Sequence, residues 1–300
     1  MRIGLCGLGR MGMNMAARIQ RGGHEVIAWN RTKTKKGTLL QTGAAWAETL
    51  EELVTALAPP RVVWLMVPAA AVDGLIDQVL PLLDSDDILV DGGNCLYTDT
   101  QRRARAVSEQ GVHFLDAGVS GGIWGLQIGY CTMVGGDEGA YDRLRPILDV
   151  LAPPDGHLYC GPSGAGHFVK MVHNGIEYGM MQAYAEGFEL LDASQFDLDL
   201  TKVAHLWNQG SVIRSWLLEL GEDALKKDPS LEGVEAYVED SGEGRWTILE
   251  AVKLGVPATV LASSLFARFS SRQDNSFSNR MLAMLRKEFG GHAIVEAKDR

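Results

Sequence analysis

The sequence predicts an α/β protein in which a doubly wound, mostly parallel sheet is followed by an all-helical part. Three observations support this fold class. Short apolar runs alternate with helical patterns through the first half of the 300-residue chain, the motif G-x-G-x-x-G directly follows the first apolar run, and no convincing strand follows residue 162. Alternation of strands and helices is typical of a parallel sheet.

The expected elements of the first half are short. Seven apolar runs are predicted to be strands, at residues 2–6, 25–29, 62–67, 87–90, 112–116, 130–134 and 158–160. Four segments with helical spacing of their apolar residues are predicted to be helices, at residues 11–21, 49–57, 70–83 and 98–110. This order predicts a sheet with helical crossovers.

A junction rich in glycine and proline, at residues 161–166, ends the alternating pattern. The predicted domains are therefore residues 1–162 and 163–300. The second domain begins with a long helical pattern at about 165–193, and a loop is expected at 228–240, with Pro229 and Gly233. Its other expected helices lie at 201–209, 212–225, 246–254, 258–270 and 277–289.

Composition argues against several classes of protein. A formal net charge of -10 disfavours a general nucleic-acid or membrane-surface binder, although a locally basic site can still bind an anion. The four cysteines form no Cys-x-x-Cys pair and do not have the spacing of zinc ligands, so no metal site is expected. A reduced, cytoplasmic setting is expected instead. The N-terminus is not typical of a signal peptide, and no stretch approaches the ~20 apolar residues of a membrane span.

The run Gly7-Leu8-Gly9-Arg10-Met11-Gly12 is typical of a dinucleotide-binding loop in a Rossmann-type domain, because it follows a strand and opens a helix. Gly7 would permit the tight turn, Gly9 the approach of the pyrophosphate, and Gly12 close packing of helix on strand. The helix N-terminus would then offer N–H groups to phosphate. A glycine-rich turn without a ligand is the alternative.

The end of the second predicted strand indicates which dinucleotide binds. NAD sites usually place Asp or Glu there for the ribose 2′-hydroxyl. This chain instead has a basic turn without a carboxylate, made of Asn30, Arg31 and Thr32 with Lys33, Lys35 and Lys36 close by. Because Arg31 can pair with a 2′-phosphate, NADP is predicted, with NAD as the alternative. A solvated basic turn without a role would also explain the lysines.

Two polar turns are expected at the carboxyl edge of the sheet, where ligands bind in such folds. Asp91-Gly92-Gly93-Asn94 follows one predicted strand, and Ser120-Gly121-Gly122 follows the next after a turn. The hydroxyl of Ser120 and exposed N–H groups suit a carboxylate or sugar hydroxyls. Val67 and Asn94 complete the predicted cofactor-binding residues. Either turn alone is more often structural.

One helical stripe carries the candidate chemistry. Lys170, His173, Asn174 and Glu177 are spaced i, i+3, i+4 and i+7, which stacks side chains on one helix face. A partly buried lysine loses affinity for its proton, so Lys170 is a candidate base during hydride transfer and Glu177 a candidate acid. Asn174 and Gly175 are poor helix formers, which favours function over a solvated helix face.

A second cluster of basic residues lies near the C-terminus, among apolar helical residues: Arg268, Arg272, Arg280, Arg286 and His292. In an acidic protein this concentration suggests an anion, most naturally a substrate phosphate. A solvated helix face is the alternative.

At these positions the chain resembles 6-phosphogluconate dehydrogenase, the decarboxylating enzyme of the pentose phosphate pathway, in its short bacterial form within the β-hydroxyacid dehydrogenase superfamily. The run Lys-x-x-His-Asn-Gly-Ile-Glu-Tyr at 170–178 is its most specific element, since related 3-hydroxyisobutyrate and tartronate semialdehyde reductases usually follow the lysine with an Asn-Asn pair. The other matching segments are 7–12, 30–32, 91–94, 120–122 and 286–292.

The resemblance implies oxidative decarboxylation of 6-phospho-D-gluconate to D-ribulose 5-phosphate and CO2, with reduction of NAD(P)+. Lys170 would take the proton of the C3 hydroxyl and then help to stabilise the enol, and Glu177 would protonate C1. The carboxylate and hydroxyls would be held by Asn94, Ser120, Gly121, Gly122, His173 and Asn174.

The family pattern also implies an oligomer. Tyr178 and Arg268 would hold the phosphate of this small phosphorylated sugar acid, while Arg286 and His292 would reach the site from a neighbouring subunit. A homodimer or homotetramer with a shared site is therefore expected. Residues 1–162 would bind the dinucleotide, and residues 163–300 would bind substrate and form the oligomer.

Some positions depart from the pattern of the long enzymes. Ile123 and Trp124 stand where those enzymes carry two acidic residues. Ser241 and Glu243 stand where a lysine and a threonine precede a Gly-Lys-Trp-Thr run, so Arg245, Arg272 and Arg280 are candidates to replace the missing phosphate contacts. The long enzymes have two copies of the helical half, and here a second chain is expected to supply what that duplication supplies.

Two other functions remain open from the sequence. A reversible β-hydroxyacid dehydrogenase would act on an unphosphorylated C3 or C4 acid without decarboxylation. A catalytically silent dinucleotide-binding protein would bind cofactor without turnover. The presence of both Lys170 and Glu177 favours an enzyme over the silent protein.

Overall fold

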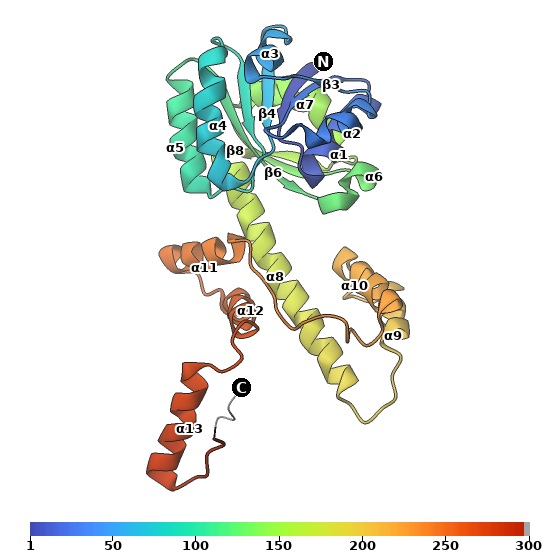
Figure 1. Ribbon diagram of the computed structural model, residues 1–300, viewed down its shortest axis with the longest axis vertical. Helices are drawn as coiled ribbons and strands as arrows, with labels where there is room; N and C mark the ends of the chain where they lie inside the picture. Colours follow the sequence, from blue (N-terminus) through green and yellow to red (C-terminus); the bar gives the residue numbers. More distant parts are fainter. Residues whose placement is uncertain (297–300) are drawn as a thin grey trace. The chain divides into compact units, whose positions relative to one another are not determined.

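An eight-stranded sheet forms the centre of the N-terminal part of the protein (Figure 1). The computed structural model describes residues 1–296. Every neighbouring pair of strands is parallel except β6 and β7. In sheet order the strands are β3 (Ala45–Trp46), β2 (Glu25–Trp29), β1 (Arg2–Cys6), β4 (Val62–Leu65), β5 (Ile88–Asp91), β6 (His113–Ser120), β7 (Cys131–Gly136) and β8 (His157–Gly161). The predicted doubly wound, mostly parallel sheet is confirmed.

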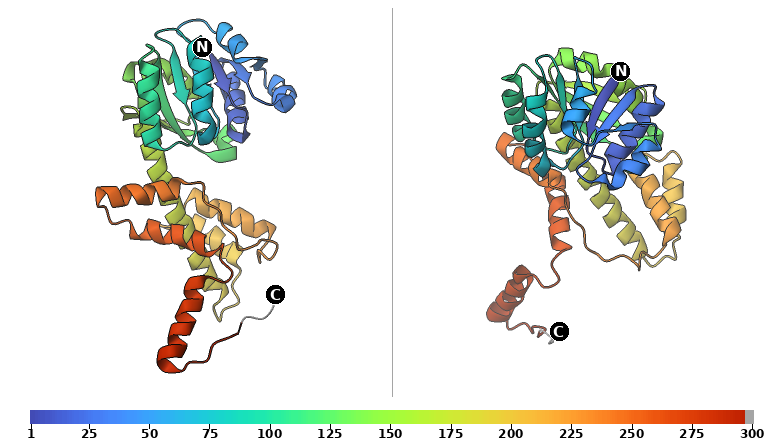
Figure 2. Two further views of the ribbon diagram at one scale, coloured as in Figure 1. Left: turned by 60° about the vertical axis from the view of Figure 1, so that its left-hand side comes forward. Right: turned by 45° about the horizontal axis from the view of Figure 1, so that its top comes forward.

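Helices cover both faces of this sheet, as the two further views show (Figure 2). The α-helices of this part are α1 (Arg10–Arg21), α2 (Lys36–Leu40), α3 (Leu50–Thr55), α4 (Ala69–Val79), α5 (Tyr97–Ser108), α6 (Gly125–Ile128) and α7 (Glu138–Leu151). Three short 3-10 helices are η1 (Lys33–Lys35), η2 (Leu80–Leu82) and η3 (Gly122–Trp124).

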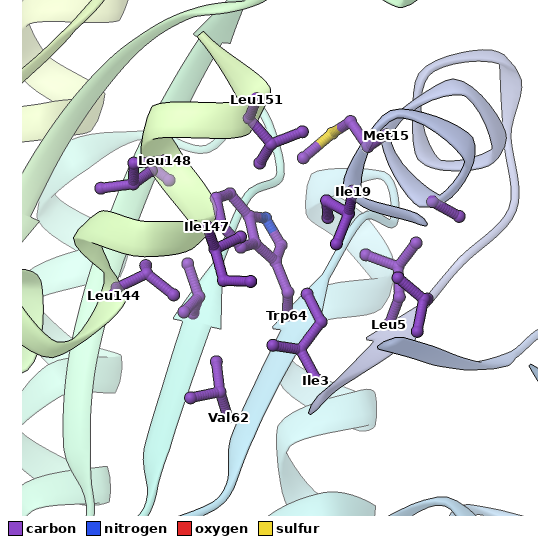
Figure 3. Close-up of a cluster of buried hydrophobic side chains, with 14 of the residues drawn as sticks. Ile3, Leu5, Met15, Ile19, Val62, Trp64, Leu144, Ile147, Leu148 and Leu151 are labelled. Atoms are coloured by element: carbon purple, nitrogen blue, oxygen red, sulfur yellow. The ribbon is translucent and has the colours of Figure 1, made fainter. Parts of the chain in front are cut away.

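Strand side chains alternate between two apolar cores, one on each face of the sheet. Trp64 of β4 is fully buried in the first core, which Figure 3 shows with side chains from β1, α1 and α7 around it. Its neighbours Val63 and Leu65 belong to the second core, with residues of α3, α4 and α5. Fully burying such a side chain contributes about 1.5–3 kcal/mol, so both helical layers are held firmly to the central strands.

Helix α7 was not predicted, because Pro146 lies inside it and removes one helical hydrogen bond. The helix forms because its buried residues recur with helical spacing, at Ala140, Leu144, Ile147, Leu148 and Leu151. Its start is capped by Asp137, whose carboxylate accepts a hydrogen bond of 2.7 Å from the Ala140 N–H. Packing therefore outweighs local propensity here.

Other boundaries also differ from the expected ones. The strand expected at 112–116 continues to Ser120, because β6 pairs with β7 up to the Ser120–Cys131 position. The helix expected at 212–225 begins at Trp216, where Ser215 caps it by accepting from the Leu218 N–H. Strand β3 and helix α2 are too short to show a period in the sequence.

The rest of the chain is helical. Tertiary contacts divide the protein into a unit that ends at Asn174 and a second unit that begins at Gly175, within the long helix α8 (Ala165–Asp192). The helices that follow are α9 (Leu200–Asn208), α10 (Trp216–Lys227), α11 (Glu243–Leu254), α12 (Thr259–Ser270) and α13 (Phe277–Gly290). No strand occurs between residues 175 and 296, as predicted. Across the described residues, no helix combines the length and apolar character that a membrane crossing requires.

Candidate active site

The glycine loop has a backbone that only glycine accommodates without strain. Gly7 has a φ of +104°, and a Cβ atom there would lie 2.4 Å from the carbonyl oxygen of Met66. A Cβ atom on Gly12 would lie 2.2 Å from the carbonyl oxygen of Gly7, so Gly12 lets α1 begin close to β1. A Cβ atom on Gly9 would meet no heavy atom within 4 Å. The space beside the Gly9 backbone is therefore open to a ligand.

The start of α1 suits a phosphate group. Gly9 precedes the helix, no side chain caps it, and its first turn contains no acidic residue. The N–H groups of this turn, at the positive end of the helix dipole, are thus left for an anion. Arg10 is exposed, whereas Leu8 is buried and Met11 packs against the first core. These residues fit the pyrophosphate of a dinucleotide.

Asn30 joins the turn after β2 to the glycine loop. Its Oδ1 accepts a hydrogen bond of 2.9 Å from the Leu8 N–H, and its amide donates to the carbonyl oxygen of Thr32 at 2.9 Å. The side chain of Arg31 is exposed and makes no hydrogen bond or ion pair with any other residue between 1 and 296. Of the three predicted cofactor residues, Asn30 and Thr32 shape the turn, and Arg31 is available to a ligand.

A carboxylate lies beside this turn, contrary to the expectation from the sequence. Glu48 follows β3 and forms ion pairs with Lys33, at 2.7 Å between Nζ and Oε2, and with Lys36. The hydrogen bonds from Lys33 and then Lys36 lower the pKa of Glu48 to about 2, so it is ionised at neutral pH. The prediction of a turn without a carboxylate was wrong because the unpredicted strand β3 brings residue 48 to this point.

The turns after β4 and β5 adjoin the glycine loop. A Cβ atom on Gly7 would lie 2.9 Å from Cγ1 of Val67, and one on Gly93 would lie 3.0 Å from the Val67 carbonyl oxygen. Val67 therefore lies between the two turns. Asn94 is exposed at the end of the second turn.

Asp91 has a structural role in that second turn. It is the last residue of β5 and is fully buried. One carboxylate oxygen accepts from the Gly93 N–H at 3.0 Å, and the other accepts from Arg103 at 3.3 Å. Arg103 also binds Asp73 of α4, so these contacts fix the shape of the turn that presents Asn94.

The start of α8 is fixed to β6 by Asp116. Its buried carboxylate accepts hydrogen bonds from the Gly164 N–H at 2.7 Å and from the His167 N–H at 2.8 Å, which satisfies the first turn of α8. Two residues further along β6, a Cβ atom on Gly118 would lie 2.3 Å from Cβ of Lys170. The sequence analysis missed both residues, which place Lys170 against the sheet.

The predicted helix face is assembled as expected beside the end of β6. The hydroxyl of Ser120 lies 3.2 Å from Nε2 of His173. Nδ1 of His173 lies 3.4 Å from Nζ of Lys170 and 2.9 Å from Oδ1 of Asn174. Lys170 is 7% exposed. A base, an imidazole, an amide and a hydroxyl therefore converge within one network.

The turn after Ser120 continues in glycine conformations. Gly121 and Gly122 have positive φ values of 128° and 52°. Ile123 and Trp124 follow in η3 and are 56% and 40% exposed, and the Ile123 carbonyl accepts from Asn14 of α1 at 3.1 Å. This turn is thus joined to the helix that follows the glycine loop.

Glu177 lies one helical turn after His173 and Asn174 on α8 and is partly exposed. Gly175, which the sequence analysis counted in favour of function, has a packing role. A Cβ atom there would lie 2.7 Å from Cγ2 of Thr247 in α11. This glycine allows close contact between the two helices.

Tyr178 is the centre of a polar cluster in the second unit. The guanidinium of Arg268 lies 3.5 Å from the centroid of its ring, a cation–π contact. The Tyr178 hydroxyl accepts a hydrogen bond of 3.1 Å from the Ser241 N–H, and the Ser241 hydroxyl donates to the carboxylate of Glu243. The structure thus brings together Tyr178 and Arg268, with Glu243 as an additional buried acid.

Two arginines proposed as replacement phosphate contacts already have a partner. Asp240 accepts hydrogen bonds from Arg245 at 2.7 and 3.0 Å and from Arg272 at 2.7 Å. These two guanidinium groups, Arg245 foremost, hold the pKa of Asp240 well below its usual range. Arg268 does not bind this carboxylate and donates to the Glu239 carbonyl instead.

The structure does not bring Arg280, Arg286 or His292 to Tyr178. Arg280 and Arg286 are exposed on α13, which has no buried residue, and His292 follows it. Within residues 1–296, His292 contacts Phe289 of the same segment, with ring centroids 6.1 Å apart. Within residues 1–296 these three side chains therefore lie outside the polar cluster around Tyr178.

Comparison with known families decides the classification. The family model described as the NAD binding domain of 6-phosphogluconate dehydrogenase matches residues 2–161, and the one described as the C-terminal domain of that enzyme matches residues 166–295. The chain belongs to the 6-phosphogluconate dehydrogenase family. The resemblance drawn from residues 170–178 is thus confirmed, and the N-terminal part is a nicotinamide dinucleotide-binding domain.

Relatives of similar length occur in this family. A Haloferax volcanii protein named as an NAD(+)-dependent, decarboxylating 6-phosphogluconate dehydrogenase is 46% identical over 302 residues, covering 100% of both chains. A Bacillus subtilis protein, YqeC, named as a candidate 6-phosphogluconate dehydrogenase, is 45% identical and covers 98% of this chain and 99% of its own. The Plasmodium falciparum 6-phosphogluconate dehydrogenase structure, described with NADP+ and with 6-phosphogluconate, has a TM-score of 0.85 at 32% identity and covers 100% of this chain and 67% of its own.

Proposed function

We propose that this protein catalyses the oxidative decarboxylation of 6-phospho-D-gluconate to D-ribulose 5-phosphate and CO2, with reduction of NAD(P)+. The observation that carries the proposal is the network of Lys170, His173, Asn174 and Ser120 beside a sheet edge that also holds the glycine loop. Such a site combines a hydride acceptor, a buried amine and donors for a polyhydroxy acid. Membership of the family supports the same reaction.

The first step is oxidation at C3. Lys170 takes the proton of the C3 hydroxyl as the C–H bond breaks, and a nicotinamide dinucleotide held by the glycine loop would supply the hydride acceptor. His173 bridges Lys170 and Ser120, so the amine and the hydroxyl donor are held in fixed positions relative to each other. Ser120, Asn174 and Asn94 orient the carboxylate and hydroxyls, with the Gly121 and Gly122 backbone, so that C3 faces the nicotinamide.

The second step is loss of CO2 from the resulting β-keto acid. The C1–C2 bond breaks and its electron pair moves into C2–C3, which generates an enolate on the C3 oxygen. Protonated Lys170 stabilises that oxygen by donating its proton back, which gives the enol. Glu177 then protonates the former C2 carbon, which becomes C1 of ribulose 5-phosphate, while Lys170 takes back the enol proton and the ketone re-forms. The helical spacing of Lys170 and Glu177 on α8 supports this division of roles.

We infer that both NADP and NAD are cofactors, with NADP favoured by the exposed and unpaired guanidinium of Arg31. Gly7, Gly9, Gly12 and the first turn of α1 would hold the pyrophosphate, with Leu8, Arg10, Met11 and Val67 alongside and Asn30 and Thr32 shaping the adenosine end. The Glu48 carboxylate weakens the preference that the sequence alone predicts.

We further propose a homodimer or homotetramer with a shared site in the cytoplasm. Residues 163–300 would bind substrate and form the interface, and residues 1–162 would bind the dinucleotide. Support comes from the second unit's small core of Ala204, Leu218 and Leu225, and from exposed apolar side chains on α13 that include Phe277, Leu282 and Phe289. Tyr178 and Arg268 would then hold the phosphate with Arg286 and His292 of the partner subunit.

One observation favours a second candidate, a β-hydroxyacid dehydrogenase that acts on an unphosphorylated acid. The buried carboxylate of Glu243 lies beside Tyr178, where it disfavours a phosphate dianion. Products distinguish the two functions. Incubation with 6-phosphogluconate and NADP or NAD, followed by mass spectrometry, should yield ribulose 5-phosphate. No such product, together with oxidation of 3-hydroxyisobutyrate by NADP or NAD or reduction of tartronate semialdehyde by NADPH or NADH, would favour the second candidate.

A further inference from the structure

The turn after β2 contains an ion-pair arrangement that the proposed reaction does not use. We call it the Glu48 clamp, and it consists of Lys33, Lys36 and Glu48. The carboxylate binds the Lys33 ammonium at 2.7 Å through one oxygen and the Lys36 ammonium through the other. Each ion pair therefore occupies a different oxygen, and one acid is shared by Lys33 and Lys36, so it offsets one of their two positive charges.

The register of β2 and β3 places Glu48 opposite Asn30, the residue at the end of β2 where the dinucleotide is selected. Strands β2 and β3 pair in parallel at Ile27–Ala45 and Ala28–Trp46, and the Ala47 N–H donates to the Ala28 carbonyl at 2.9 Å. Continued past the strand ends, this register sets Glu48 opposite Asn30. NAD sites usually carry their ribose-binding carboxylate at the end of β2, where this chain has Asn30. A carboxylate is thus present at that level but comes from the next strand.

The clamp is held in place and can be reached from solvent. The Glu48 N–H donates to the carboxylate of Glu52 at 2.7 Å, and the Glu52 N–H donates to the Thr49 hydroxyl at 3.1 Å at the start of α3. The side chains of Glu48, Lys36 and Lys33 are 36%, 42% and 73% exposed. The backbone of Glu48 is therefore fixed and its Oε2 is buried, while the side chains of Lys33 and Lys36 remain accessible to a nucleotide.

We propose that Glu48 sets the dinucleotide preference of this site, because it withholds Lys33 and Lys36 from a 2′-phosphate and adds negative charge beside it. Arg31 and Lys35 are the cations of this turn that have no carboxylate partner within residues 1–296. Because Glu48 holds the ammonium groups of Lys33 and Lys36 and offsets one of their two charges, a 2′-phosphate gains less attraction from this turn, whereas the binding of a 2′-hydroxyl depends little on these charges. The site therefore binds NAD together with NADP. This inference rests on the proposed function, in which the turn binds the adenosine end.

Replacement of Glu48 by glutamine tests the assignment. In Glu48→Gln both lysines are released, so the dissociation constant of NADPH should fall about tenfold and that of NADH should change less than about twofold. Nicotinamide fluorescence reports both constants without turnover. Glu51→Gln is the matched control, since it removes the same charge from an exposed neighbour that makes no lysine ion pair. It should leave the ratio of the two constants unchanged.

A second variant does not depend on the folding of the first. Because the clamp already withholds Lys33, Lys33→Met should change NADPH affinity less than about threefold while Glu48 remains paired with Lys36. A tenfold loss there would mean that Lys33 contacts the 2′-phosphate directly and would overturn the proposal, as would an unchanged NADPH to NADH ratio in Glu48→Gln. If the wild-type protein bound neither dinucleotide, the proposed function itself would fail.

Discussion

Gly118 of β6 and Lys170 of α8 pack so closely that a Cβ atom on the glycine would lie 2.3 Å from Cβ and 2.9 Å from Cγ of the lysine. The sheet therefore determines where the stem of Lys170 lies. Its ammonium end reaches 3.4 Å from Nδ1 of His173. A glycine inside a strand weakens the strand, and here it permits the close approach that positions the proposed base.

Gly118→Ala should displace α8 and misplace Lys170. We expect kcat to fall at least about tenfold and the free energy of unfolding to fall by about 1–3 kcal/mol, because overpacking strains both elements. Steady-state kinetics and urea denaturation measure the two effects. Gly74→Ala in α4 is the control, since a Cβ atom there meets no heavy atom within 4 Å. If Gly118→Ala kept the wild-type kcat, Gly118 would have no role in positioning Lys170.

Lys170→Met should abolish turnover and leave the affinity for NADPH nearly unchanged. The thioether keeps much of the stem that packs against Gly118 but cannot take a proton from the C3 hydroxyl. Single-turnover absorbance at the reduced-nicotinamide band measures chemistry, and fluorescence titration measures binding. Lys227→Met, at an exposed lysine of α10, should behave as wild type. Activity near wild type in Lys170→Met would eliminate Lys170 as the base.

Arg31→Asp should shift the preference from NADP towards NAD. The exposed guanidinium of Arg31 is the strongest available partner for a 2′-phosphate, and an aspartate would repel that group while accepting from a 2′-hydroxyl. The ratio of kcat/KM for the two cofactors is the measurement. If that ratio does not move, the 2′-phosphate is recognised elsewhere.

Arg286→Ala should raise KM for 6-phosphogluconate far more than KM for the cofactor, because Arg286 would serve the partner's phosphate site. Arg286 is exposed on α13, a helix without any buried residue. Co-expression with the Lys170→Met chain tests sharing directly. In dimers that form at random from the two variants, a site is intact only when one chain supplies Lys170 and the other supplies Arg286, which holds for about one quarter of all sites. Activity should therefore rise above that of either variant alone. No recovery, with an unchanged KM, would rule out the shared phosphate site.

The sequence predicted those parts of the site that depend on local pattern. The glycine loop follows a strand and opens a helix, and residues 170–178 combine helical spacing with a specific run of polar residues. Both signals are contained in a few adjacent residues, so no knowledge of the sheet was needed to find Gly7, Lys170 or His173.

The remaining parts depend on contacts between distant segments. Asp116 caps a helix that begins almost fifty residues later, and no periodicity in the sequence marks it. Glu48 reaches the cofactor turn only through β3, whose two residues are too few to show alternation. Helix α7 was hidden by Pro146. Each miss reflects tertiary packing that outweighs local propensity.

The central claim is coupled oxidation and decarboxylation, and the most direct test is the stoichiometry of the two products. The protein would be incubated with 6-phosphogluconate labelled with carbon-13 at C1 and with NADP or NAD, and reduced nicotinamide would be followed by absorbance while labelled CO2 is measured by mass spectrometry. The account predicts equal amounts of both products throughout the reaction. Reduced nicotinamide without labelled CO2 would contradict it and would indicate a dehydrogenase that stops at the keto acid.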